Sequence, residues 1–191
     1  MKQRWGVDRA STIVDDPTFQ DKMFLSLKSW GAFRAAGVRH DILLQNLRTA
    51  LSSIRPYLAP FEEIDILDFD PLTHADPLYE LFDAVRDIKP TSVKLMPASK
   101  ALYLLLPNLI PPMDSTYTAP FLTGRRGLPT GLDKTFLVDC FSTFSGIAKG
   151  VGRGRLTQLA SHQKFSVRLG LGRVIDFGIC GYEVVLAGEL E

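Results

Sequence analysis

Lys100 and Asp114 are the first residues in this sequence whose types and spacing could support chemistry. Lys100 stands near the start of an apolar run, and Pro107 and Pro111 lead the chain from that run to Asp114. An isolated buried charge is costly, so a lysine beside such a segment faces solvent, joins a structural ion pair or is tuned for function. We therefore treat the two as candidate catalytic residues. The alternative is that Asp114 caps a following helix while Lys100 points to water or pairs with Asp114.

A basic, glycine-rich segment in the second half of the chain is the second candidate, as a binding site for phosphate. It comprises Lys149, Gly150, Gly152, Arg153 and Arg155, between two predicted helices. Glycine lets the backbone approach a ligand closely, and the positive end of a helix dipole favours an anion. The pattern is also typical of a helix C-cap followed by a flexible turn. Further cations expected to support phosphate binding are Arg125, Arg126, Lys164 and Arg168.

Charge is distributed unevenly along the chain, although the formal net charge is only +1. Acidic residues dominate 61–90, and basic residues dominate 122–175. A basic stretch can bind DNA or another polyanion through electrostatic attraction that carries no sequence preference. The acidic and basic segments could equally complement each other inside the fold. A third reading gives the acidic segment a protein partner.

Other sequence features predict which cofactors and partners the protein lacks. His40, His74 and His162 are scattered without metal-ligand spacing, and the apolar neighbours of Cys140 and Cys180 indicate buried, reduced thiols. No GxSxG motif occurs, and no apolar run approaches the roughly 20 residues that span a bilayer. The first residues show no signal sequence. We therefore expect a cytoplasmic protein with no metal or nucleotide cofactor and no membrane partner.

A mainly helical fold must position these candidates. Hydrophobic residues make up 46% of the chain and charged residues 23%, a composition typical of a globular domain that can bury one core. Apolar residues recur at helical spacing in several segments, and 97–106, which is apolar on nearly all sides, is expected to lie at the centre. The predicted helices cover 17–36, 39–55, 77–88, 97–106, 135–149 and 156–162.

The remaining segments are less regular. Residues 1–16 are expected to form an N-terminal arm, and 17–191 a single helical domain. Gly37 predicts the end of the first helix, and Asp76-Pro77 predicts a capped start for the third. We expect an extended connector over 57–71 and a long irregular crossing over 107–132. Local propensity leaves 173–186 open between a strand and a helix.

The segment around Lys100 also carries a resemblance. The run Ser99-Lys100-Ala101-Leu102, with Leu105, Pro107, Ile110, Pro111, Met113, Asp114 and Ser115, is similar to an uncharacterised bacterial family with a serine-lysine, leucine, proline and aspartate pattern. Near the C-terminus, Arg173, Asp176 and Tyr182 resemble the arginine-aspartate segment that closes the sequences of that family. This resemblance implies no established activity.

More distantly, the same run resembles the helix-hairpin-helix base-excision DNA glycosylases. In those enzymes an aspartate assists departure of a damaged base, and in the bifunctional members a lysine attacks the sugar C1′. The resemblance implies that Asp114 and Lys100 take these roles. The glycine-hydrophobic-glycine segment Gly150-Val151-Gly152 also resembles the helix-hairpin-helix DNA-binding motif, whose free backbone N–H groups meet a phosphate.

From the sequence we therefore expect a nucleic-acid-associated binding module that docks phosphates through 149–155. A glycosylase-like enzyme using Lys100 and Asp114 is the first alternative. A protein-interaction domain that uses the acidic 61–90 surface is the second.

Overall fold

Helices dominate the structure, as predicted, and no strand occurs among the residues that the computed structural model describes. Those residues are 9–34, 37–90, 93–125, 127–161 and 170–186. Two short 3₁₀ helices, Ala59–Phe61 and Arg86–Ile88, follow α3 and α4. The α-helices are α1 Ala10–Ile13, α2 Pro17–Ser29, α3 His40–Leu58, α4 Pro71–Val85, α5 Leu95–Leu105, α6 Thr118–Thr123, α7 Lys134–Val151, α8 Arg153–Ala160 and α9 Leu171–Leu186.

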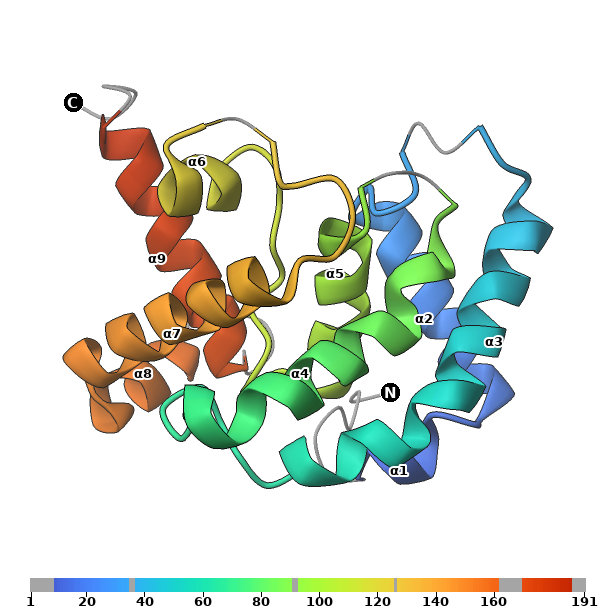
Figure 1. The fold of residues 1–191 in the computed structure, drawn as a ribbon, viewed down its shortest axis with the longest axis horizontal. Helices are drawn as coiled ribbons and strands as arrows, with labels where there is room; N and C mark the ends of the chain where they lie inside the picture. Colours follow the sequence, from blue (N-terminus) through green and yellow to red (C-terminus); the bar gives the residue numbers. More distant parts are fainter. Residues whose placement is uncertain (1–8, 35–36, 91–92, 126, 162–169, 187–191) are drawn as a thin grey trace.

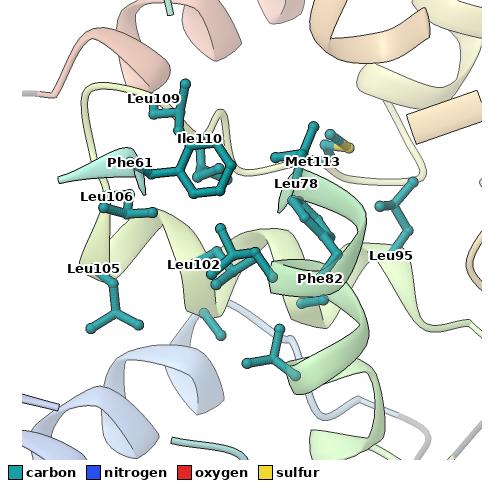
Figure 2. Packing of buried hydrophobic residues seen from close by; sticks show 14 of the residues in the cluster. Phe61, Leu78, Phe82, Leu95, Leu102, Leu105, Leu106, Leu109, Ile110 and Met113 are labelled. Carbon is teal, nitrogen blue, oxygen red and sulfur yellow. The ribbon is translucent and has the colours of Figure 1, made fainter. Parts of the chain in front are cut away.

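The core forms around α5, the helix that the sequence predicts at the centre. In Figure 1, α5 lies in the middle of the molecule, with α2 and α4 against it. Leu102 of α5 is fully buried, and Figure 2 shows Phe82 and Leu78 of α4 close to it. Burying one such side chain contributes about 1.5–3 kcal/mol, so this packing holds α5 against α4.

The helix α2 ends at Ser29, and the predicted helix 17–36 is too long. Gly31 takes a left-handed conformation with φ of 69°. The N–H of Gly31 donates to Lys28 O, and that of Ala32 donates to Leu27 O, which together form a Schellman C-cap. Both Gly31 and Gly37 could end a helix, and the predicted end was at Gly37. The earlier one ends the helix.

Two prolines inside helices account for further corrections. The helix α3 continues past Pro56, where the sequence predicted its end, to Leu58, whose side chain is completely buried. The helix α4 begins at Pro71 rather than at Pro77, and the Asp70 carboxylate caps it by accepting from Leu72 N at 3.1 Å. Its first turn escaped prediction because it presents no apolar stripe, Leu72 itself being 95% exposed.

The connectors contain more structure than predicted. The segment 57–71 is not extended but folds through the end of α3, a 3₁₀ helix and turns. The crossing 107–132 includes the short helix α6. Part of the expected N-terminal arm packs into the core as well, because Ala10 and Val14 are buried. No helix of the described residues is both long enough and apolar enough to cross a membrane.

The C-terminal helices complete the fold. The helix α7 is longer than the predicted 135–149, α8 lies earlier than the predicted 156–162, and 173–186 is helical within α9. The start of α9 is seated against the chain that leaves α5, where Gly172 N donates to Pro107 O at 3.0 Å. A side chain at Gly170 or Gly172 would collide with the backbone of Pro107 or Ile110. Glycine at these positions therefore lets α9 approach α5.

Candidate functional site

This close approach produces a charged cluster, which we define as Lys100, Asp114, Arg173, Asp176 and Cys180. Lys100 comes from α5, Asp114 from the segment before α6, and the other three from α9. The nearest ligand-type atoms of Asp114, Asp176 and Cys180 all lie within 4.8 Å of one another. Lys100 interacts electrostatically with both carboxylates. The structure thus brings together Lys100 and Asp114, as the sequence suggested, and adds three residues from the other end of the chain.

Lys100 is half-buried and has a fixed position. Its Nζ donates a hydrogen bond to Trp30 O at 2.9 Å. This carbonyl is free to accept because Trp30 is the C-cap residue of α2, and the chain turns away after it through Gly31. Burial lowers the pKa of Lys100 below its usual value, and the charges of Asp114 and Asp176 partly oppose that shift.

Asp114 caps a turn, whereas the structural alternative had it cap the following helix, whose N-cap is Tyr117. Its Oδ1 accepts hydrogen bonds from the backbone N–H groups of Thr116 at 2.8 Å and Tyr117 at 2.7 Å. The buried Ser99 hydroxyl fixes the same segment, accepting from Met113 N at 3.0 Å. Capping and proximity to Lys100 therefore occur together, and the serine beside the lysine ties α5 to the aspartate segment.

Asp176 is the most deeply buried charged group of the cluster, with a side chain that is 3% exposed. Its Oδ2 accepts from Arg173 Nη1 at 2.5 Å, one helical turn away, while its Oδ1 has no hydrogen-bond partner in the described part of the chain. Burial raises the pKa of Asp176 to about 6, with Arg173 acting in the opposite direction and Asp114 adding to the rise. Removing water from a carboxylate favours its neutral form, which is the main cause of this shift.

Aromatic rings border the cluster on its Arg173 side. The Arg173 guanidinium lies 4.5 Å from the centroid of the Phe177 ring and 5.7 Å from that of Trp30. Trp30 also packs on Tyr103, with 5.7 Å between ring centroids. The sequence analysis named Asp176 only as part of a family resemblance and gave it no role in a site. The spacing of Arg173 and Asp176 on one helical turn was the available signal.

The two thiols differ in how deeply they are buried. Cys140 is buried in α7, and burial raises its pKa to about 12. Cys180 is partly buried in α9, and burial raises its pKa to about 11, with the carboxylates of Asp176 and Asp114 adding to the effect. Both are free thiols, and the predicted burial holds for Cys140, whereas Cys180 is only partly buried.

The glycine-rich segment differs from its expected form. Gly150 lies inside α7, and only Gly152, with φ of 83°, separates α7 from α8. The Gly152 N–H donates to Ala148 O at 2.9 Å, so it is already engaged within the protein. No side chain caps the N-terminus of α8 within the described residues. The first amides of α8 are thus the part of this segment that still suits an anion.

Several cations of this segment have partners inside the protein. Arg153 forms ion pairs with Asp65 and Asp68, and Lys149 Nζ donates to Phe69 O at 3.3 Å. Arg155 is exposed and donates to Gln158 Oε1 at 2.7 Å. The acidic and basic segments therefore complement each other in part. The same ion pairs occupy Asp65 and Asp68, two of the acidic residues that a protein partner could have bound.

The supporting cations are only partly placed. Arg125 is exposed just after α6, and its backbone is fixed by Thr123 Oγ1, which accepts from Arg125 N at 3.1 Å. Arg126, Lys164 and Arg168 lie outside the described residues.

An apolar pocket of about 320 Å³ opens elsewhere on α9, between α6, α7 and α8, with Phe121, Val151 and Ile179 in its lining.

Comparison with known proteins adds no assignment. The chain matches no model of a protein family, no curated protein and no solved structure. The function must therefore be argued from the residues themselves.

Proposed function

We propose that the protein acts on nucleic acid as a glycosylase-like enzyme, with Lys100 and Asp114 as its reacting groups. The observation that carries this proposal is that the half-buried Lys100 amine, in the middle of the central helix α5, interacts electrostatically with Asp114. Perturbed titratable groups that gather on several elements are characteristic of active sites. The substrate class comes from the resemblance of the segment around Lys100 to base-excision DNA glycosylases.

The chemistry assigned to each group is specific. The neutral Lys100 amine attacks C1′ of a damaged nucleotide, and a C–N bond forms as the glycosidic bond breaks. The base leaves with the bonding electron pair and takes up the proton that the attacking nitrogen loses, while the Asp114 carboxylate stabilises the positive charge that develops on the sugar. Burial of Lys100 favours the uncharged, nucleophilic form of its amine. The sugar ring then opens, as the C1′–O4′ bond breaks and O4′ takes up a proton, which converts the adduct into an imine that borohydride can reduce. Hydrolysis of this imine releases the sugar and restores the amine.

A panel of duplex oligonucleotides, each with one oxidised, deaminated or alkylated base, tests this proposal. We expect base release from at least one duplex, together with a borohydride-trapped adduct that disappears in Lys100→Met. Asp114→Asn should slow base release by about 100-fold or more. Lys22→Met, at an exposed lysine of α2, is the matched control and should behave as wild type.

Circular dichroism of each variant establishes that the helices remain folded before its activity is compared. Absence of base release across the panel, or an adduct that persists in Lys100→Met, would refute the proposal. Base release without an adduct would remove the lysine from the reaction and leave Asp114 alone as the reacting group.

Phosphate docking at the start of α8 is the second candidate function. The uncapped α8 N-terminus and the exposed Arg155 favour it, whereas the carboxylates of Asp65 and Asp68 beside Arg153 oppose an incoming phosphate. Because the internal ion pairs weaken this site, we rank it below the charged cluster. Both candidates share nucleic acid as the partner.

Binding of a fluorescent DNA duplex across a range of salt concentrations tests the docking site. Affinity should fall steeply as salt rises, and Arg155→Ala should weaken binding and make the salt dependence shallower. Arg39→Ala, at an exposed arginine that pairs with Asp41, serves as the control. Equal binding by both arginine variants, or no binding at low salt, would contradict this assignment.

A further inference from the structure

Three side chains of the charged cluster form a set of ligands that the proposed reaction does not use together. Asp114, Asp176 and Cys180 each present one ligand-type atom, and these atoms lie within 4.8 Å of one another. The three side chains come from two separate parts of the chain, and none of them is exposed. Carboxylate oxygens and a thiolate sulfur together suit a borderline divalent ion such as Zn²⁺ or Co²⁺ rather than Mg²⁺ or Ca²⁺.

An independent observation also points to a ligand at this place. Asp176 is 3% exposed, and its Oδ1 accepts no hydrogen bond from any residue that the structure describes, although its Oδ2 is held by Arg173. Buried polar atoms are almost always satisfied, and an exception calls for a missing proton, water or ion. A cation bound at Oδ1 would satisfy the atom without disturbing the bond to Arg173.

We propose that Asp114, Asp176 and Cys180 bind one divalent transition-metal ion. Metal–ligand bonds of about 2.0–2.3 Å in tetrahedral geometry separate the ligand atoms by about 3.4–3.7 Å, so small side-chain rotations complete the site. Binding breaks the S–H bond of Cys180, and the proton goes to solvent while the sulfur pair binds the ion. Three protein ligands leave the fourth position for water.

The charge around the site can accommodate the ion. Lys100 and Arg173 carry two positive charges that balance the two carboxylates. A divalent ion with the new Cys180 thiolate adds one further positive charge, which an anion or hydroxide in the fourth position can neutralise. The two neighbouring cations limit the affinity of the site, and a strong thiolate bond is needed to offset their repulsion.

Metal binding at this site does not depend on the proposed reaction, but a bound ion would compete with that reaction for Asp114. An ion on Asp114 would occupy the carboxylate that the glycosylase-like step requires, so bound metal should inhibit base release. Metal binding is measured without any substrate. A protein that binds metal but releases no base would thus refute the proposed function alone, and the converse result would refute the metal site alone.

Titration of the chelator-treated, full-length protein with Co²⁺ tests the site directly. We expect one equivalent to produce a thiolate-to-cobalt charge-transfer band in the near ultraviolet, with visible bands typical of four-coordinate cobalt. Zn²⁺ should then bleach these bands. A wild-type titration without the charge-transfer band overturns the proposal, and the unsatisfied Asp176 oxygen is then explained by a protonated carboxyl group.

The second thiol of the chain provides a matched control. Cys180→Ser should lose the charge-transfer band, whereas Cys140→Ser, at the buried thiol of α7, should keep it. Asp176→Asn should weaken cobalt binding at least about 10-fold, and Asp139→Asn, at an exposed carboxylate of α7, should not. A band that survives in Cys180→Ser, or an unchanged affinity in Asp176→Asn, overturns the proposed ligand set even if Cys140→Ser fails to fold.

Discussion

Alanine at Gly31 should destabilise the protein, because this residue ends α2 in a left-handed conformation with φ of 69°. An L-residue in that conformation costs about 1–2 kcal/mol. The smaller entropy of the unfolded chain offsets about 0.4–1 kcal/mol of that cost. The new Cβ would also lie 2.7 Å from Arg34 Nε, although this flexible side chain can move away. The expected net loss is about 1 kcal/mol of unfolding free energy.

The same replacement at Gly146 should have the opposite sign. Gly146 lies inside α7, is exposed, and has no atom within 4 Å of the position that a Cβ would take. Alanine in a helix interior is favoured over glycine by about 0.8–1 kcal/mol. The two glycine-to-alanine variants should therefore differ by about 2 kcal/mol, with the wild type between them.

Urea denaturation followed by far-ultraviolet circular dichroism measures this difference. The transition midpoint should fall in Gly31→Ala and rise in Gly146→Ala, with equal slopes, because neither change alters the surface exposed on unfolding. A midpoint in Gly31→Ala at or above that of wild type would show that α2 does not end in this turn. The account of why Trp30 O is free to accept from Lys100 would then be wrong as well.

Three further predictions concern the site and the core. Burial raises the pKa of Asp176 to about 6 from an ordinary 3.8. In chelator-treated protein, the wild type should therefore lose about 2 kcal/mol of stability relative to Asp176→Asn as the pH rises from about 4 to about 7. A difference in stability that stays constant with pH would contradict this. Leu102→Ala, at a fully buried position of α5, should cost about 2–5 kcal/mol in chemical denaturation, and a loss below that range would place Leu102 outside the core. Arg153→Ala should lower the urea midpoint more at low salt than at high salt, because the exposed Arg153 guanidinium forms ion pairs with Asp65 and Asp68, and a loss that does not change with salt would show that these pairs are not its cause.

The helical class and the central helix were predictable because they depend on local pattern. The run 97–106 is apolar on nearly every side, and only a position in the core satisfies such a helix. The helix ends were harder to predict where two signals competed. Gly31 and Gly37 both offered a stop, and Asp70-Pro71 and Asp76-Pro77 both offered a capped start. Tertiary packing selects between such pairs, and it leaves no trace in the local sequence.

The candidate site could be predicted only in part, for a related reason. Lys100 and Asp114 stand close in sequence on either side of one turn, so their proximity follows from a short connection. Asp176 and Cys180 join them only because α9 docks at Gly170 and Gly172 against the backbone that leaves α5. The periodicity of 173–186 does not indicate this docking of α9. The docking depends on the absence of side chains at Gly170 and Gly172, which are far from Lys100 in the sequence.

The backbone also explains why this cluster can hold charges beside a hydrophobic core. Trp30 O accepts from Lys100, and Ser99 fixes the segment of Asp114, so each of these elements is anchored by a polar group that is itself satisfied. Asp176 is the exception, because one of its oxygens has no partner although the side chain is almost fully buried. A buried group left unsatisfied in an otherwise well-bonded surrounding costs stability, and such costs persist where a ligand, a proton or a reaction makes use of them. The charged cluster rather than the glycine turn is therefore the place where the function of this protein should be sought first.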